Sequence, residues 1–496
     1  MGNFWVRENA IIEKSETSKL RKRTIDEVDN DQDIIKAKLE EENLHTPKRK
    51  KLKSTSKYIY DTLFVNGENS DVIISALGRE WKLHKVYLCQ SGYFCSMFSG
   101  SWKESSKDII HMNIPDDNID EEALEIAFGS LYRDDVLITP ALVVSVLAAA
   151  TLLGLDGLIQ QCADIMMENI SVKTVCVYHA AAVMYGQQKV SQHCLGWLEK
   201  NIMTTQCCDL LKDIGISVMR KIIESEDLFV MQVEMDVYSM LKKWLFLQLN
   251  QTWTGGTKAL AHDSDNFFKK QASESKCAFL ETESGKQYQP VFADVRLQHV
   301  ISDLTSVKLL EQDKVIPQGW LLPLYKQQWF QMLRVEQGID KGLDSADYPS
   351  FGKEAMRCGR VLQREGEYCW RWTGFNFGLD LLMSVTKRLV TLKRNAYSQS
   401  SSGSVSLQAK RNIVFRVTVA SLNSLGQTVF IKHSEILKVA LSKDEEAVIM
   451  SIDPQVPFPL YVSVNWLVYH PQEVPGSAGQ SSSQHGNSSS NPAEQH

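Results

Sequence analysis

The spacing of the apolar residues changes along this chain, and the change limits the folds open to it. Apolar residues recur every three or four positions over most of 119–250, as on one face of a helix, but alternate with polar residues over most of 355–471, as in strands. The chain has 496 residues, more than one hydrophobic core usually holds. We therefore predict about three domains, with helices in the middle and β-structure at the end.

A strand hairpin and a helix are predicted where the ordered chain begins. The hairpin covers 71–85 with its turn at 77–79, and Trp81 and Leu83 share one side of its second strand. Ser91 stands at the N-cap position of the helix that follows. The apolar face of this helix has four residues: Tyr93, Phe94, Met97 and Phe98.

The rest of the chain divides by pattern and composition. Helices are predicted over 119–132 and from the Thr139 cap to Gly154, and again over 292–310 and after Pro323. The patterns together predict five segments: a disordered charged tail (1–56), an α+β domain (57–170), a helical region with a polar insertion or loop near 251–285 (171–340), an antiparallel β-sandwich or barrel (355–471) and a disordered tail (472–496).

Charge and hydropathy exclude several classes of protein. The net charge is -6, so general nucleic-acid binding is not expected, and the longest apolar run, 141–155, is shorter than the roughly 20 residues of a membrane helix. One basic cluster has the character of a nuclear-import signal, and its other interpretation is a solvated run of charge. Its residues are Lys48, Arg49, Lys50, Lys51 and Lys53.

Histidine and cysteine side chains raise the possibility of an enzyme or a metal site. His84 with Cys89 or Cys95 is the candidate nucleophile pair, but both thiols lie in an apolar stretch, where we expect them to be buried and inert. The zinc candidates, 193–194 and 207–208, are adjacent pairs, whereas zinc ligands are usually separated by two to four residues. We predict no catalytic residue, no metal and no cofactor.

The first domain resembles the BTB/POZ fold. The resemblance depends on eight positions: Asp71, His84, Leu88, Ser91, Tyr93, Phe94, Met97 and Phe98. The helical stretch 171–250 is similar to the BACK region that often follows such domains. Longer phrases, including SGYFCSMFSGSWKES, FGSLYRDDVLI and EYCWRWTGFNFG, resemble the germ cell-less family over about 46–471. Val6 stands where a myristoylation motif needs Ser or Thr, which suggests a paralogue without that anchor.

The resemblance implies two protein-binding surfaces in the first domain. A homodimer seam is expected at Tyr58, Ile59, Leu63 and Phe64. A cullin-3 type scaffold is expected to bind Trp102, Glu104, Tyr132, Met97 and Phe98, and the BACK-like region to extend that contact. In the last domain, four aromatic residues either recruit a substrate or fill the core: Trp370, Trp372, Phe375 and Phe377.

The resemblance thus predicts a non-enzymatic adaptor of a ubiquitin ligase. It implies a protein substrate, a role in spermatogenesis or germ-cell development, and residence at the nuclear matrix or envelope, with neither nucleic-acid binding nor membrane insertion. The alternative is a nuclear-envelope or matrix scaffold and transcriptional co-regulator without ligase activity, which would bridge lamina-associated or transcription-factor proteins.

Overall fold

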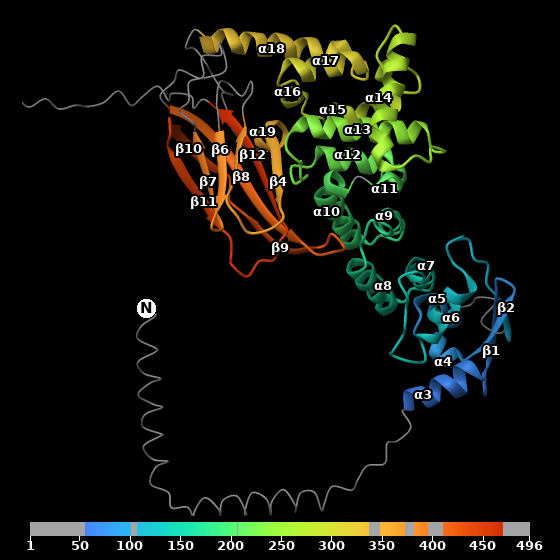
Figure 1. Cartoon of the computed structure of the whole chain (residues 1–496). Coiled ribbons are helices and arrows are strands. Elements are labelled where there is room, and N and C mark those ends of the chain that lie inside the picture. Colours follow the sequence, from blue (N-terminus) through green and yellow to red (C-terminus); the bar gives the residue numbers. More distant parts are fainter. Residues whose placement is uncertain are drawn as a thin grey trace, which may run out of the picture. The chain divides into compact units, whose positions relative to one another are not determined.

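The computed structural model describes residues 55–100, 107–205, 207–336, 348–372, 381–394 and 410–469 (Figure 1). The chain forms two compact units, residues 1–137 and 138–496, and each is described by itself. The tails predicted to be disordered and the basic cluster at 48–53 lie outside the described residues. No helix among those ranges is long and apolar enough to cross a membrane.

The first unit contains the predicted hairpin. Strands β1 (Val72–Ala76) and β2 (Arg79–Leu83) pair antiparallel, and β3 (Ile109–His111) adds to β1 in parallel. Leu77 and Gly78 both have positive φ, 50° and 83°, which is the backbone of a two-residue hairpin turn that matches the twist of the strands. The hairpin prediction is confirmed.

Helices pack against this sheet. They are α3 (Thr55–Ile59), the π-helix η1 (Tyr60–Val65), α4 (Lys85–Leu88), α5 (Gly92–Ser99) and α6 (Glu121–Gly129). The Ser91 hydroxyl accepts a hydrogen bond from the Phe94 backbone N–H at 3.4 Å, so the predicted cap of α5 is confirmed. Trp81, Phe94 and Phe128 are buried together. The ring centre of Phe128 lies 5.3 Å from that of Trp81 and 6.2 Å from that of Phe94.

The second unit begins with two helices, α7 (Val143–Leu153) and α8 (Asp156–Glu168). The predicted start of the first helix at Thr139 is wrong. Residues 139–142 form a turn in which the Leu142 N–H donates to the Thr139 carbonyl at 3.0 Å, and the helix begins after it. Gly154 ends α7 as predicted, in the left-handed conformation with φ 65°.

Helices continue to residue 354. Those before residue 250 are α9 (Val175–Met184), α10 (Gln188–Thr205), α11 (Cys208–Asp213), α12 (Ile216–Glu224) and α13 (Glu234–Leu249). Short turns η3 (Phe279–Glu281) and η4 (Lys286–Tyr288) precede α15 (Gln289–Ala293), α16 (Leu297–Val300), α17 (Leu304–Asp313), α18 (Gln318–Glu336) and α19 (Tyr348–Glu354).

Of the two interpretations of the polar stretch near 251–285, a loop is wrong, because α14 (Thr257–Glu274) occupies most of it and buries Leu260 and Phe268. An insertion stays a prediction. The expected helix start after Pro323 is also wrong. Helix α18 begins at Gln318 rather than after Pro323, so this proline lies inside the helix, at the cost of one backbone hydrogen bond.

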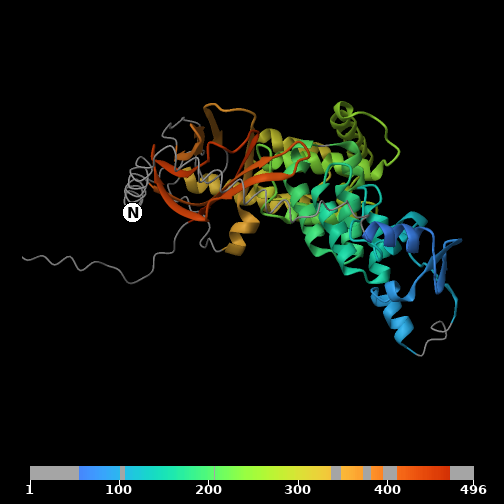
Figure 2. The same cartoon turned by 90° about the horizontal axis from the view of Figure 1, so that it is seen from below.

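The end of the chain is a sandwich of two antiparallel sheets, as predicted. One sheet has the strand order β10-β8-β12-β4, and β9 pairs with β8 in the same sheet. The other sheet has the strand order β11-β7-β6-β5. The strands are β4 (Met356–Leu362), β5 (Tyr368–Trp372), β6 (Leu381–Thr386), β7 (Leu389–Arg394), β8 (Lys410–Leu422), β9 (Thr428–His433), β10 (Leu437–Ser442), β11 (Glu446–Ser451) and β12 (Leu460–Tyr469). Their inward side chains form one buried cluster, and helices α10 to α13 lie beside the sandwich (Figure 2).

Candidate functional site

The predicted dimer seam is only partly a surface. Tyr58 is 61% exposed, whereas Ile59 and Leu63 are half-buried. Phe64 is only 6% exposed, and its ring packs against those of Tyr60 and Tyr132 at 5.1 and 5.3 Å. The expectation that Phe64 lies at a surface is therefore wrong, because it belongs to the core of the first unit.

Tyr132 is also a core residue rather than a contact for a partner. It is 4% exposed, and its hydroxyl oxygen accepts from the His84 backbone N–H at 3.0 Å. His84 Nε2 lies 2.8 Å from the Glu68 carbonyl, which can only accept, so Nε2 carries the proton and Nδ1 accepts from the Tyr132 hydroxyl at 3.2 Å. Burial raises the pKa of Tyr132, which keeps this hydroxyl protonated. The side chain of His84 is itself buried, so it does not share the exposed side of the strand with Glu80 and Lys82.

Tyr132→Phe is expected to destabilise the protein by about 1–3 kcal/mol, because it leaves the buried His84 N–H without its acceptor. Thermal unfolding of the full-length protein measures the loss. Tyr93→Phe is the matched control, because Tyr93 is 36% exposed and lies outside the predicted dimer seam, so this variant should unfold at the wild-type temperature. Equal melting temperatures for the two variants would contradict a structural role for the Tyr132 hydroxyl.

The candidate nucleophile pair is not assembled. Cys89 and Cys95 are exposed, so the expectation that they are buried is wrong. Both ring nitrogens of His84 are occupied by Tyr132 and Glu68. Partial burial, followed by the nearby Cys95 and Asp71, raises the pKa of Cys89, which lowers its thiolate fraction at neutral pH.

Of the residues considered and rejected as zinc ligands, His193 and Cys194 have other surroundings. His193 is exposed and its Nδ1 lies 2.9 Å from the Lys189 carbonyl, while Cys194 is buried, and burial raises its pKa to about 12. Within the described ranges, no group of three His, Cys, Asp or Glu side chains is placed to hold a metal ion.

Helix α5 presents one of the predicted cullin-binding residues. Met97 is buried at 5% exposure, whereas Phe98 is half-buried, stacks on Phe94 and has the Lys85 ammonium 5.6 Å from its ring centre. Trp102 and Glu104 lie outside the described residues. Two exposed apolar residues near Phe98 in the chain were not predicted as contacts, namely Val86 at 73% and Tyr93 at 36% exposure.

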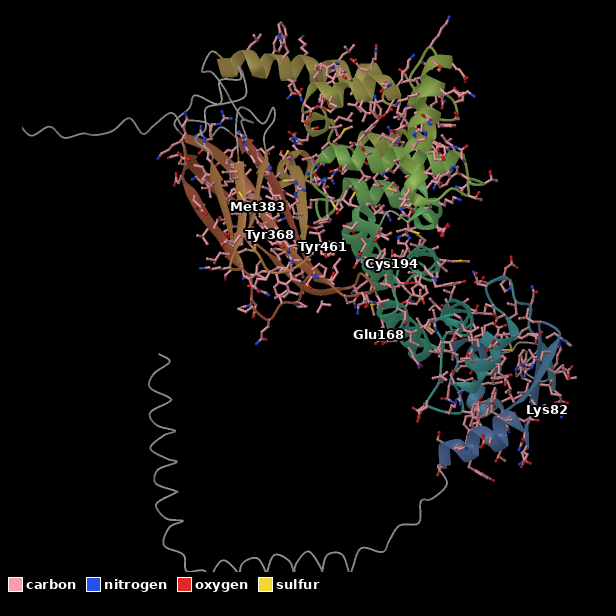
Figure 3. The ribbon with its side chains drawn as sticks, in the orientation of Figure 1. Lys82, Glu168, Cys194, Tyr368, Met383 and Tyr461 are labelled. Carbon is pink, nitrogen blue, oxygen red and sulfur yellow. The ribbon has the colours of Figure 1, made fainter. Side chains whose placement is uncertain are left out.

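The aromatic residues of the last domain are only partly described. Trp370 is half-buried, stacks on Tyr368 with ring centres 6.3 Å apart, and packs against the sandwich core. Figure 3 labels Tyr368 on the sandwich. This packing supports the interpretation that at least this side chain fills the core. The side chain of Trp372, and both Phe375 and Phe377, lie outside the described residues.

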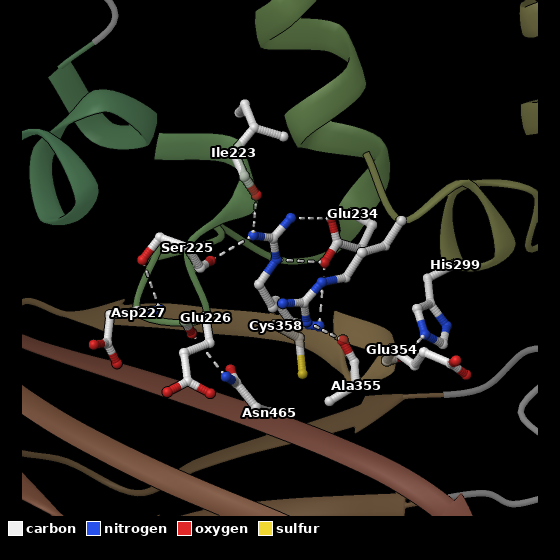
Figure 4. Close-up of polar contacts among 12 residues, drawn as sticks. Ile223, Ser225, Glu226, Asp227, Glu234, His299, Glu354, Ala355, Cys358 and Asn465 are labelled. Atoms are coloured by element: carbon white, nitrogen blue, oxygen red, sulfur yellow. Dashed lines mark hydrogen bonds and ion pairs between the residues drawn. The ribbon is translucent and has the colours of Figure 1, made fainter. Parts of the chain in front are cut away.

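A buried ion pair joins the helical region to the sandwich, and sequence reasoning missed it. Arg357 on β4 and Glu234 at the start of α13 have no exposed side-chain surface and are bonded in a fork, Nε to Oε1 at 2.7 Å and Nη2 to Oε2 at 3.1 Å. Arg357 Nη1 also donates to the carbonyls of Ile223 and Ser225, each at 2.8 Å (Figure 4). The partners are 123 residues apart, so no local pattern could have indicated the pair.

Further contacts join the same two regions. Arg416 on β8 pairs with Asp227 at 2.7 Å and with Glu226 at 3.3 Å. The turn between β8 and β9 contacts α10, where Trp197 Nε1 donates to the Leu425 carbonyl at 2.9 Å and Asn201 Nδ2 donates to the Gly426 carbonyl at 2.9 Å. The helical region and the sandwich are thus joined at several separate points.

The class of protein follows from this organisation and from comparison with known proteins. Residues 60–170 match the BTB/POZ domain family, so the chain is a BTB-domain protein, in which helices and a β-sandwich follow the interaction domain. This layout supports an adaptor-type protein that works through dimerisation and protein–protein contacts. Over most of its length, the chain belongs to the germ cell-less family.

The relatives differ in how much of the chain they share. Germ cell-less protein-like 1 of Homo sapiens is 55% identical over 432 residues, 87% of this chain and 84% of its own length. Protein germ cell-less of Drosophila melanogaster is 37% identical over 451 residues, which are 86% of this chain and 79% of its own length. The human Kelch repeat and BTB domain-containing protein 8 is 24% identical over 196 residues, 38% of this chain and 31% of its own.

Proposed function

We propose that this protein is a non-catalytic, substrate-specific adaptor of a cullin-3 type ubiquitin ligase. The observation that carries the proposal is the BTB/POZ domain with exposed apolar side chains on α4 and α5. Val86, Tyr93 and Phe98 lie shortly before Trp102 and Glu104 in the chain. Tryptophan and tyrosine are enriched in the hot spots of protein interfaces, and Trp102 and Tyr93 are of this kind.

In this proposal the buried residues have structural roles. Phe64, Met97 and Tyr132 shape the domain from inside, whereas Tyr58, with Ile59 and Leu63, meets a second copy. The sandwich, held to the helical region by the Glu234–Arg357 pair, presents the substrate. Ubiquitin transfer is then accelerated because the substrate's effective concentration near the ubiquitin carrier rises, and dimerisation adds avidity.

The place of action in this proposal is the nucleus, at the matrix or envelope, in developing germ cells. The basic residues 48–53 support nuclear entry. Membership of the germ cell-less family supports a role in germ cells, which this proposal narrows to spermatogenesis.

The double variant Trp102→Ala and Glu104→Ala is expected to lower the affinity for the cullin-3 amino-terminal domain by about 30-fold or more, because truncating a hot-spot anchor costs about 2 kcal/mol or more. Binding is measured with purified full-length protein, and light scattering reports the dimer. The matched control is Trp329→Ala with Glu311→Ala, which removes an exposed tryptophan and glutamate from helices α18 and α17 and should bind normally.

Two results would count against the adaptor proposal. If both double variants bind cullin-3 equally, the anchor is elsewhere. If the dimeric wild-type protein binds no cullin-3 at all, the alternative of a nuclear scaffold and transcriptional co-regulator takes its place.

A further inference from the structure

A cleft opens between the helical region and the sandwich, within the second unit. Its volume is about 720 Å³, which lies in the range of sites that hold a peptide segment or a ligand of similar size. Helix α10 and the loop before α13 form one wall, and β4, β12 and the turn between β8 and β9 form the other. Figure 3 labels Tyr461 on β12, on the side of the sandwich that faces these helices.

The lining combines an apolar floor with hydrogen-bonding groups. Trp197, Leu425 and Tyr461 supply apolar surface, and Leu425 is 46% exposed. Hydroxyl and amide side chains such as Thr204 and Gln363 surround them. This composition suits an extended polypeptide, whose backbone needs hydrogen-bond partners while one side chain fills an apolar pocket.

The charge around the cleft is positive. Lys173 is the one charged residue among the described residues that line it. Tyr461 also lines a neighbouring pocket of about 240 Å³, which contains Lys200 and the Arg416 cluster. Arg416 is balanced by Glu226 and Asp227, and Lys200 interacts with Glu199 and donates to the Gly196 carbonyl at 3.3 Å. Lys173, which lines the cleft itself, favours a ligand that carries negative charge.

The walls are held in place before any ligand arrives. The bonds from Trp197 and Asn201 fix the carbonyls of Leu425 and Gly426. Gly426 has φ 78°, and a Cβ atom there would lie 2.4 Å from Asn201 Oδ1, so only glycine permits this close approach. A rigid site binds with less loss of conformational entropy than a site that must be ordered first.

We infer that this cleft binds an extended segment of a partner polypeptide in which an acidic residue neighbours a large apolar residue. The apolar side chain lies against Trp197, Leu425 and Tyr461, and the carboxylate is attracted by Lys173. The inference rests on the proposed function, because the partner would be the substrate presented to the ligase.

The test uses full-length protein and a display library of short random-sequence peptides. The wild-type protein is expected to enrich peptides with an acidic residue close to a large apolar one. Lys173→Glu with Leu425→Asp should weaken binding of those peptides at least about tenfold, because it reverses the charge and removes the apolar contact. Both residues are exposed, so the substitutions do not disturb the core. The matched control is Lys443→Glu with Val448→Asp, which makes the same kinds of change at exposed positions outside the cleft lining. Val448 lies in β11 and Lys443 shortly before it, and this variant should bind the peptides like wild type.

The inference would be overturned by no enriched motif, by enrichment of basic peptides, or by equal binding of the selected peptides to both double variants. Self-association lost only in the cleft variant would identify a second copy as the occupant and also overturn it. Cullin-3 binding is measured on the same samples. Normal cullin-3 binding without peptide selection refutes the cleft alone, whereas cleft-dependent selection without cullin-3 binding refutes the ligase role alone.

Discussion

Arg357→Ala is expected to lower the free energy of unfolding by about 3–5 kcal/mol and the melting temperature by roughly 10 °C. The substitution removes the fork of hydrogen bonds around Glu234 and leaves this carboxylate buried without its main cation. It also leaves the carbonyls of Ile223 and Ser225 without this donor. Calorimetry on the full-length protein measures the change.

The stability lost in the Arg357→Ala variant should become smaller as the pH falls. Burial alone would raise the pKa of Glu234, but the charge and hydrogen bonds of Arg357 outweigh it and hold the pKa below its ordinary value of 4.5. A depressed carboxyl pKa contributes stability that is present above the unfolded-state pKa and lost as the pH falls through the folded-state pKa. The difference between wild type and variant should therefore shrink below about pH 4.5.

Arg220→Ala is the control for this experiment. Arg220 on α12 pairs at 2.9 Å with Asp294, the residue after α15, but half of its side chain is exposed, and such surface pairs contribute little to stability. A similar small loss for both arginine variants would show that the Glu234–Arg357 pair does not hold the sandwich to the helices.

Gly359→Ala is the second substitution with a large expected effect, a loss of about 3 kcal/mol. A Cβ atom at this position of β4 would lie 2.8 Å from the carbonyl oxygens of Val230 and Val462 and 2.9 Å from the Phe229 ring. Two of these neighbours are backbone atoms, and the Gly359 carbonyl accepts a hydrogen bond from the Gln232 N–H at 2.9 Å. The 229–232 loop therefore cannot move away from β4 without losing this hydrogen bond. Urea unfolding of the full-length protein measures the loss.

Gly157→Ala provides a control with the opposite sign. Gly157 lies in α8 with no atom within 4 Å of an added Cβ, so alanine should stabilise the helix by about 1 kcal/mol. If Gly359→Ala were neutral or stabilising as well, this result would contradict the close packing of the 229–232 loop against β4.

Local rules were sufficient for much of the fold. The turn at Leu77 and Gly78, the Ser91 cap and the Gly154 helix end each depend on one or two residues whose backbone preference decides the structure. The buried face of α13, with Val237, Leu241 and other residues at helical spacing, follows from periodicity alone. The alternation of β8 and β12 likewise indicated the sandwich.

Other features depend on weaker or non-local signals. Helix α14 was not predicted within the polar stretch, which was interpreted as an insertion or loop, because its buried positions form a stripe only one residue wide: Leu260, Ser264 and Phe268.

The candidate sites were harder to predict than the fold, because burial depends on tertiary contacts. Tyr132 and Phe64 have the aromatic character of an interface anchor, and only packing distinguishes a core ring from a surface ring. The cleft needs residues 171–205 and 423–426 side by side, a juxtaposition that no single sequence window contains.

The Glu234–Arg357 pair also affects how this protein should be cut into pieces. A fragment that starts near 355, where the change in periodicity suggests a boundary, would carry Arg357 without its carboxylate and would expose the strand edge that loop 229–232 covers. Chimaeras that exchange the carboxy-terminal part between relatives should therefore place the junction before Ile216, so that both members of the pair come from the same parent.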